Sequence, residues 1–227
     1  MAKILDGKAI SAESRTELKA RVSGLKEQGI VPGLGVLLVG DDPASRSYVT
    51  AKERACEEAG IYSKEVKLLA TASHDEILKV VEEFNQDDRI NGILVQLPLP
   101  DSSMEQSVIE AIRPEKDVDG FHPVNVGRMM LGLPAFIPCT PHGILQILKR
   151  SGIETCGAHV VVIGRSNIVG RPMMNLLSQK SDLGNATVTM CHTRTKNMKE
   201  LTLQADIIIA AVGWPDTVTA DMVREGA

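Results

Sequence analysis

Short apolar runs alternate with segments of helical spacing along the first half of the chain. Strands are expected at residues 34–39, 65–70 and 92–97. Helices are expected at residues 10–28, 45–59 and 73–85, where apolar residues recur every three or four positions. This order, one helix followed by βαβαβ, is typical of a parallel sheet whose strands are joined by right-handed crossovers.

The same alternation returns in the second half. A helix is expected from His142 to Arg150, followed by strands at 159–164, 186–191 and 206–212 and by a helix that ends at Ser178. We place the domain junction within residues 137–150. The sequence therefore predicts an α/β protein with two domains, residues 1–140 and 141–227. The first is expected to be a three-layer α/β domain, and the second resembles a mononucleotide-binding unit of the Rossmann type.

Lys52 is the first candidate for chemistry. It lies within the apolar stripe that Val49, Cys56 and Ala59 form on the 45–59 helix, and Tyr48 lies one turn before it. A lysine that loses hydration can exchange protons near neutral pH. The alternative is a side chain that runs past the stripe to water. Gln96 ends a buried strand, and ligands of parallel sheets bind beyond the carboxyl ends of the strands, so Lys52 and Gln96 are expected to face one cleft.

Residues 114–127 are rich in Pro, Gly and acidic residues. Asp117, Asp119 and His122 permit a metal site, but two carboxylates and one histidine in a loop more often form turns and caps. A third possibility is that Asp119 accepts paired hydrogen bonds from an amine-rich ring.

The loop from Gly164 to Pro172 follows a buried strand and enters a helix, so its N–H groups are placed to bind a phosphate. It is not the usual G-x-G-x-x-G, because Ser166 stands where a glycine would. The next strand ends in His192-Thr193-Arg194, with no acid for the ribose hydroxyls of NAD. Arg165 and Arg194 are candidates for a 2′-phosphate, which favours NADP, although both arginines can equally be surface charges.

Composition excludes several classes of function. Hydrophobic residues make up 43% of the 227 residues and aromatic residues only 3%, so the core must be aliphatic. The net charge is −4, with both signs spread along the chain, and this gives no reason to expect nucleic acid or a membrane as partner. The four cysteines form no C-x-x-C pair, which indicates reduced thiols and no metal. No signal or transit segment opens the chain, and a cytoplasmic protein is expected.

Taken together, the segments resemble those of the bifunctional methylenetetrahydrofolate dehydrogenase/methenyltetrahydrofolate cyclohydrolase family. The motifs that carry this resemblance, in family order, are GDDPASRSYVTAK (40–52), GILVQLPLP (92–100), KDVDGFHPVNVG (116–127), PCTPHGI (138–144), VVIGRSNIVGRPM (161–173) and CHTRTKN (191–197). The resemblance implies oxidation of 5,10-methylenetetrahydrofolate with NADP⁺, followed by hydrolysis to 10-formyltetrahydrofolate. It also implies tetrahydrofolate derivatives as ligands and a homodimer formed through the Rossmann half.

The resemblance further implies a role for each matching residue. Lys52 looks like the catalytic lysine, Gln96 like its hydrogen-bond partner, and Tyr48 like the aromatic residue that packs on the folate. Asp119 is expected to hold the pterin ring. Ser45, Leu97 and Pro98 are expected to line the same folate site. The expected NADP site consists of Gly164, Arg165, Ser166, Ile168, Thr193 and Arg194.

Two departures from the family pattern leave alternatives open. The family usually has Ser in place of Thr193, and the added methyl group crowds the expected 2′-phosphate pocket. The family also continues beyond Ala227, so a C-terminal part of the Rossmann sheet is expected to be missing. One alternative is therefore a catalytically impaired folate- or nucleotide-binding protein, or a dimerisation partner. Another is a dehydrogenase with little cyclohydrolase activity, against which Tyr48, Lys52 and Gln96 argue.

Overall fold

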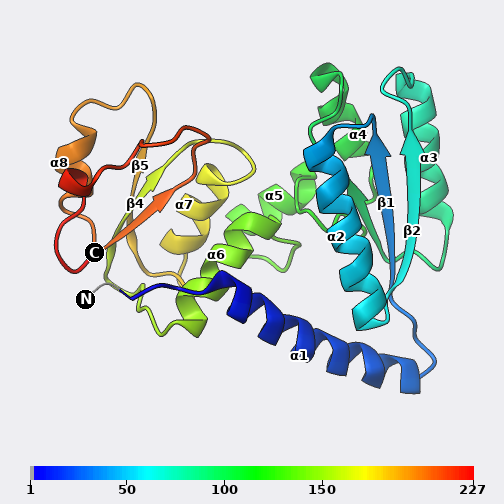
Figure 1. Ribbon diagram of the computed structural model, residues 1–227, viewed down its shortest axis with the longest axis horizontal. Helices are drawn as coiled ribbons and strands as arrows, with labels where there is room; N and C mark the ends of the chain where they lie inside the picture. The colour runs from blue at the N-terminus through cyan, green and yellow to red at the C-terminus, as the bar shows by residue number, and fades with distance from the viewer. Residues whose placement is uncertain (1–2) are drawn as a thin grey trace. The chain divides into compact units, whose positions relative to one another are not determined.

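A computed structural model describes residues 3–227 of the chain. Packing divides the chain into two compact units, one that ends at Asn125 and one that begins at Val126. Each unit has its own parallel sheet with helices against it (Figure 1). The junction expected within residues 137–150 lies later in the chain than this division, and it stays a prediction.

The first unit has the predicted order of one helix followed by βαβαβ. Its elements are α1 (Gly7–Glu27), β1 (Gly33–Val39), α2 (Pro43–Ala59), β2 (Tyr62–Leu68), α3 (His74–Gln86), β3 (Gly92–Val95), the 3-10 helix η1 (Ser102–Met104) and α4 (Glu105–Ala111). The strands form a parallel sheet in the order β2-β1-β3. Helix α5 (Pro123–Met130) then spans the division between the units.

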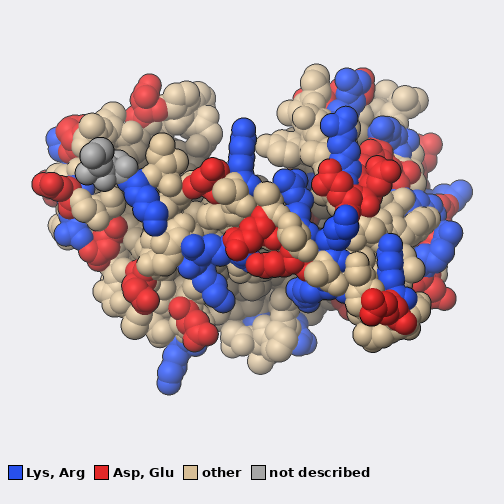
Figure 2. Space-filling model, turned by 60° about the horizontal axis from the view of Figure 1, so that its bottom comes forward, with Lys and Arg blue, Asp and Glu red and all other residues tan. Residues whose placement is uncertain are grey.

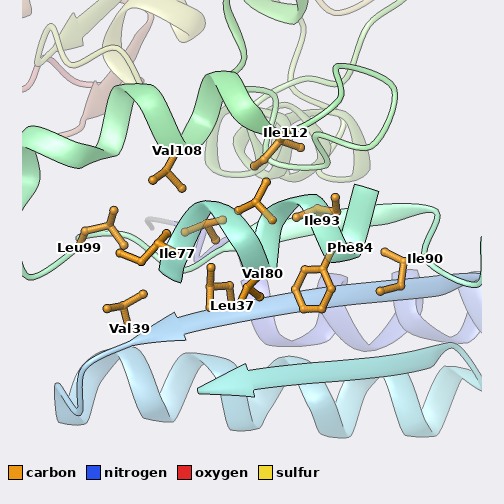
Figure 3. Close-up of a cluster of buried hydrophobic side chains, with 12 residues drawn as sticks. Leu37, Val39, Ile77, Val80, Phe84, Ile90, Ile93, Leu99, Val108 and Ile112 are labelled. Atoms are coloured by element: carbon orange, nitrogen blue, oxygen red, sulfur yellow. The ribbon is translucent and has the colours of Figure 1, made fainter. Parts of the chain in front are cut away.

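Strand β1 lies at the centre of the first unit and is covered on both faces. Leu37 and Val39 belong to one buried cluster with Phe84 of α3 and Val108 of α4 (Figure 3). Neighbouring residues of a strand point to opposite faces. Accordingly, other β1 residues, Val36 and Leu38, join a separate cluster with Val49 of α2. Both clusters are almost wholly aliphatic, and the predicted three-layer arrangement is confirmed.

Helix α2 begins and ends where the sequence indicates. The Asp42 carboxylate accepts a hydrogen bond from the Ser45 N–H at 2.8 Å, and Pro43 occupies the first turn. Gly60 ends the helix in the left-handed region, at φ 79°, which a glycine adopts without steric cost. The stripe residues Val49, Cys56 and Ala59 are all buried, as the spacing predicts.

Several predicted boundaries are wrong. Strand β2 covers Tyr62–Leu68 instead of 65–70, because an edge strand pairs on one side only and tolerates polar residues that hide its pattern. Strand β3 ends at Val95 instead of 97, where the chain turns toward a cis Leu97–Pro98 bond. Helix α6 begins at Cys139 instead of 142. Short helices α4 and α5 were not predicted, because their few apolar residues set no clear period.

The second unit repeats the design around β4. Its elements are α6 (Cys139–Arg150), β4 (His159–Ile163), α7 (Gly170–Ser178), β5 (Thr187–Cys191), α8 (Met198–Thr202), β6 (Ile207–Ala210) and the 3-10 helix η2 (Ala220–Met222). The strands are parallel, in the order β5-β4-β6. One face of β4 packs against α6 and α7, and the other packs toward α8. This is the predicted Rossmann-type arrangement, with a short β6 in place of the expected 206–212 strand.

Charged side chains of both signs are interleaved over the face of the molecule drawn in Figure 2. Within residues 3–227, no helix combines the length and the apolar character that crossing a membrane requires.

Candidate active site

The carboxyl edge of the β2-β1-β3 sheet is the first candidate site. Helix α2, which connects β1 to β2, covers one face of the sheet, and α3, which connects β2 to β3, covers the other. Because β2 and β3 lie on opposite sides of β1, the direction of the strand order reverses between β1 and β3. Ligands of open parallel sheets bind at such a point. The Gln96 N–H donates to the Leu37 carbonyl at 2.9 Å, which places Gln96 directly at this edge.

Lys52 and Gln96 are in direct contact, as predicted. The Lys52 Nζ donates to the Gln96 Oε1 at 3.0 Å, and the Gln96 Nε2 donates to the Leu97 carbonyl at 2.8 Å. The second bond fixes the amide with its oxygen toward the lysine. Side chains of a helix lean toward its N-terminus, so Lys52 reaches back from α2 to the strand ends. An ammonium has three hydrogens, and one of them serves Gln96.

The other predicted folate-site residues differ in exposure. Tyr48 is 64% exposed, and it lies one turn before Lys52 on α2. Pro98 is exposed, whereas Leu97 is partly buried against the core. Ser45 is 6% exposed and lies in the first turn of α2. The structure therefore places Tyr48 and Pro98 on the surface, whereas Ser45 is buried in the first turn of α2.

Asp117 organises the loop that carries Asp119. The Asp117 carboxylate is buried and accepts hydrogen bonds from the His122 N–H at 2.8 Å and the Asn125 Nδ2 at 2.9 Å. This is the turn chemistry that the sequence favoured over a metal. Asp117 also bridges Ile93 of β3 in parallel. The chain therefore runs toward the carboxyl edge, and half-buried Asp119 follows two residues later.

Two ionisable groups near Lys52 on α2, those of Cys56 and Glu53, have raised pKa values. Burial raises the pKa of the Cys56 thiol, and the negative charge of Glu53 raises it further. The Cys56 thiol thus stays protonated and unreactive. A hydrogen bond to Glu65 of β2 raises the pKa of the Glu53 carboxyl. Glu53 is thereby directed to the strand β2, and Lys52 alone among these groups reaches Gln96.

The carboxyl edge of the second sheet is the other candidate site. Here β4 enters α7 through residues 164–169, and a Cβ at Gly164 or at Gly170, the first residue of α7, would collide with backbone. At Gly164, which has φ 126°, it would lie 2.5 Å from the Ala211 carbonyl oxygen. At Gly170 it would overlap the Gly164 carbonyl oxygen. The two glycines therefore permit a tight turn into the N-terminus of α7, which suits a diphosphate.

The remaining residues of this loop present polar groups at the surface. The Ser166 Oγ accepts from the Val169 N–H at 3.1 Å and so closes the turn. Arg165, Ser166 and Ile168 are exposed. A guanidinium, a hydroxyl and an apolar side chain are thus available beside the start of α7.

A second turn, after β5, lies next to the first. The Gly164 N–H donates to the Cys191 carbonyl at 2.8 Å, which joins the ends of β4 and β5. The turn itself is closed by the His192 N–H, which donates to the Thr195 Oγ1 at 2.8 Å. Thr193 and Arg194 are exposed on it. Two arginines, Arg165 and Arg194, therefore follow adjacent strand ends.

The loop after β6 also reaches this edge, through the approach of Ala211 to Gly164. The sequence pattern did not identify it as part of the site. The available signal is the single tryptophan of the chain, Trp214, directly beyond an apolar strand. Among residues 3–227, no group of His, Cys, Asp and Glu side chains is placed to hold a metal ion.

Comparison with known proteins identifies the family. The model of the tetrahydrofolate dehydrogenase/cyclohydrolase catalytic domain matches residues 5–119, and that of the NAD(P)-binding domain of the same family matches residues 138–227. The bifunctional protein FolD of Bacillus mycoides is 56% identical over all 227 residues, which correspond to 78% of its length. This chain belongs to the tetrahydrofolate dehydrogenase/cyclohydrolase family.

Solved structures of family members have the same fold. The bifunctional FolD of Campylobacter jejuni superposes with a TM-score of 0.93 at 48% identity, over 97% of this chain and 77% of its own. The Trypanosoma brucei enzyme, solved with NADP and an inhibitor, superposes with a TM-score of 0.92 at 32% identity, over 98% of this chain and 76% of its own. The Lys52–Gln96 edge lies in the region matched by the catalytic domain, and the Gly164 loop lies in the NAD(P)-binding domain.

Proposed function

We propose that the protein oxidises 5,10-methylenetetrahydrofolate to the 5,10-methenyl form with NADP⁺ and then hydrolyses that product to 10-formyltetrahydrofolate. The observation that carries this proposal is the hydrogen bond between Lys52 and Gln96 at the carboxyl edge of the catalytic-domain sheet. Family membership supplies the substrate class, and the paired side chains supply the chemistry of the second step.

Lys52 is the catalytic residue in this proposal. Hydrolysis of the methenyl cation requires the attacking water to lose both of its protons, one of which the ring nitrogen gains as its bond to the bridging carbon breaks, while the other is released to solvent. An amine held by Gln96 is placed to transfer these protons. The hydrogens that Gln96 does not use remain for substrate or water. Gln96 fixes the direction of the amine, because its own amide is anchored on Leu97.

The other predicted residues bind and orient the folate. The exposed ring of Tyr48 offers a face for the reduced pterin, one turn from the reacting amine. Asp119 accepts paired hydrogen bonds from the amine-bearing side of that ring. Pro98 and Leu97 line the same edge, and Ser45 supports the first turn of α2. Holding the reacting carbon beside Lys52 is the main contribution of these groups.

The cofactor site consists of the loops that follow β4 and β5. Gly164 and Gly170 permit backbone to approach a diphosphate, and Ser166 and Ile168 lie beside it. When bound, NADP⁺ supplies the hydride acceptor. Arg165, Thr193 and Arg194 would hold the 2′-phosphate of the ribose, because two guanidinium groups favour that dianion over the hydroxyl of NAD. The protein is thus an NADP-dependent enzyme in this proposal.

The assembly and location are proposed with the same function. The enzyme is a homodimer formed through its second unit, whose sheet has edge strands β5 and β6 that each pair on one side within the chain. It works in the cytoplasm, where its four free cysteines stay reduced. Size-exclusion chromatography with light scattering measures the mass of the assembly. A monomeric mass at micromolar concentration would contradict the proposed homodimer.

The deciding experiment is turnover by the 227-residue chain. Reduced cofactor and methenyl absorbance are followed with NADP⁺ and with NAD⁺, and decay of added methenyl substrate is followed separately. The Lys52→Met variant is expected to lose methenyl hydrolysis by at least about 100-fold, because proton transfer by a positioned group contributes that much. NADP⁺ affinity is expected to stay unchanged. Equal loss of both properties would remove Lys52 from the proposed role.

A further inference from the structure

Trp214 is the single tryptophan of the chain, and its side chain is 79% exposed. Large aromatic side chains gain free energy when they leave water, so an indole held in solvent at a ligand-binding edge is notable. A wholly loose segment would account for such exposure without any ligand. The local structure of this loop is therefore the first point to establish.

The indole is carried on a defined turn. The Thr217 Oγ1 donates to the Trp214 carbonyl at 2.9 Å, and Asp216 between them adopts a left-handed conformation at φ 56°. Three residues earlier, the Ala211 N–H donates to the Ile163 carbonyl at 2.8 Å, which ties the start of the loop to the end of β4. Hydrogen bonds thus hold both the start of the loop and the carbonyl of Trp214 itself.

The sheet order determines which part of the cofactor meets this turn. The carboxyl ends of β5, β4 and β6 lie in a row along one edge. In the proposed function, the loop after β5 binds the phosphorylated adenosine and the loop after β4 binds the diphosphate. The nicotinamide half then extends to the third position in the row, beside the loop after β6. Trp214 belongs to that loop, and the crevice of such sheets lies between β4 and β6.

We propose that the indole of Trp214 lies against the nicotinamide end of the cofactor and favours its oxidised, cationic ring. This inference rests on the proposed function. The face of an indole carries negative charge density and attracts a cation, whereas the reduced ring is neutral and gains only van der Waals contact. Trp214 therefore contributes both affinity and a preference between the two redox forms.

The expected effects are modest and selective. Trp214→Ala weakens NADP⁺ binding by about fivefold, which matches a cation–aromatic contact at an exposed site. The same change weakens NADPH binding by about twofold or less. Trp214→Phe keeps an aromatic face of lower charge density and shows an intermediate loss for NADP⁺. Calorimetric titration of each variant with both forms gives the four affinities that are compared.

Because Trp214 is the only tryptophan, indole fluorescence reports on this residue alone. The probes are NADP⁺, NADPH and adenosine 2′,5′-bisphosphate, which carries the adenosine half without the nicotinamide. NADP⁺ is expected to quench the fluorescence in proportion to occupancy measured by calorimetry. The adenosine fragment is expected to bind and to leave the fluorescence unchanged.

The outcomes separate this inference from the function on which it rests. If NADP⁺ binds by calorimetry without changing the fluorescence, or if the adenosine fragment quenches as strongly as NADP⁺, the placement of Trp214 is wrong and the cofactor site stands. If Trp214→Ala weakens both redox forms equally, the preference for the cationic ring is wrong. If neither NADP⁺ nor the adenosine fragment binds by calorimetry, the proposed function fails and the inference fails with it.

Discussion

The hydrogen-bond partner of the Lys52 amine is the neutral amide of Gln96. A glutamine oxygen orients the amine by one hydrogen bond of 3.0 Å and adds no net charge. A carboxylate at the same place would form an ion pair, which holds the amine in its charged form more strongly. The choice of an amide at position 96 therefore bears directly on proton transfer.

Replacing Gln96 by Glu is expected to slow methenyl hydrolysis by about 10- to 100-fold, because a lysine held as an ion pair releases its proton less readily. Methenyl decay measures the change, and NADP⁺ affinity is expected to be unaltered. Gln204→Glu makes the same replacement at an exposed position of the other unit and serves as the control. A Gln96→Glu enzyme of full hydrolytic rate would contradict the proposed role of the pair.

Arg165 is expected to bind the 2′-phosphate of NADP⁺ and so to distinguish it from NAD⁺. Arg165→Ala removes a charge-assisted hydrogen bond, so NADP⁺ affinity falls by about 10- to 100-fold while NAD⁺ affinity changes by about twofold or less. Calorimetric titration with the two cofactors measures the ratio. Arg15→Ala, at an exposed position on α1, removes the same charge elsewhere. An equal loss of affinity for both cofactors after Arg165→Ala would show that a group other than Arg165 binds the phosphate.

The elements that carry these residues depend on a few local interactions. Helix α2 begins at the Asp42 cap, and hydrogen bonds from Ser45 hold the pKa of the Asp42 carboxyl below its ordinary value. A carboxyl group with a depressed pKa stabilises the folded state above its ordinary titration range and loses this contribution as pH falls through the folded-state value. The cap of α2 is therefore expected to weaken in acid.

Asp42→Ala is expected to lower the melting temperature at neutral pH by about 2–4 °C, as loss of one helix cap does in a chain of this size. The difference from wild type is expected to shrink as pH falls below about 4 and to vanish once pH has passed the depressed pKa of the folded-state carboxyl, where Asp42 of the wild type is protonated. Asp42→Asn keeps an acceptor at the cap and is expected to show a smaller change at neutral pH. Calorimetric melting curves against pH measure all three proteins.

The turn from β4 into α7 is expected to tolerate no side chain at Gly170. Gly170→Ala places a methyl group on the Gly164 carbonyl, and backbone must shift to admit it, at a cost of about 2 kcal/mol or more in unfolding free energy. NADP⁺ affinity is expected to fall as well. Gly143→Ala in α6, where a Cβ meets no atom within 4 Å, is expected to stabilise by about 0.5–1 kcal/mol. Urea denaturation measures the free energy of unfolding, and calorimetry measures the NADP⁺ affinity of each variant. Similar values for the two variants would contradict the predicted collision at Gly170.

Sequence patterns predicted the central elements well and the peripheral ones poorly. Strands β1 and β4 are buried on both faces, so their apolar runs reveal them. Strand β2 is an edge strand whose polar residues are partly buried, and its pattern places it several residues too late. Helices α4 and α8 have too few turns to establish a period.

The candidate site was predictable where local pattern and topology agree. Lys52 stands out as a charge within an apolar stripe, and the strand order brings Gln96 to it. The direction of the Gln96 amide was not predictable, because it depends on the carbonyl of Leu97 in a turn. The position of Trp214 was also hidden, because only the order β5-β4-β6 shows that its loop follows the strand beside β4.

At the scale of the whole molecule, the chain consists of two units that each have a sheet and buried clusters of their own. A ligand that binds only the folded state stabilises it by about 2.7 kcal/mol at 100 times its dissociation constant. When groups of one unit alone hold a ligand, the ligand is expected to make local opening of that unit less frequent and to leave the other unit unchanged. The two candidate sites fall in different units, so they are expected to respond to different ligands.

Hydrogen exchange followed by mass spectrometry tests this expectation. NADP⁺ is expected to slow exchange in β4, α7 and the turn after β5, while peptides of β1 and β3 keep their rates. A folate analogue is expected to slow exchange around α2 and the segment from Gln96 to Pro98. Arg165→Ala, titrated at the same NADP⁺ concentration, is the control, because it reduces occupancy and must reduce protection in the second unit alone. Protection by NADP⁺ spread evenly over both units would show that the chain opens as one cooperative body, because a ligand held by one unit then stabilises every peptide equally.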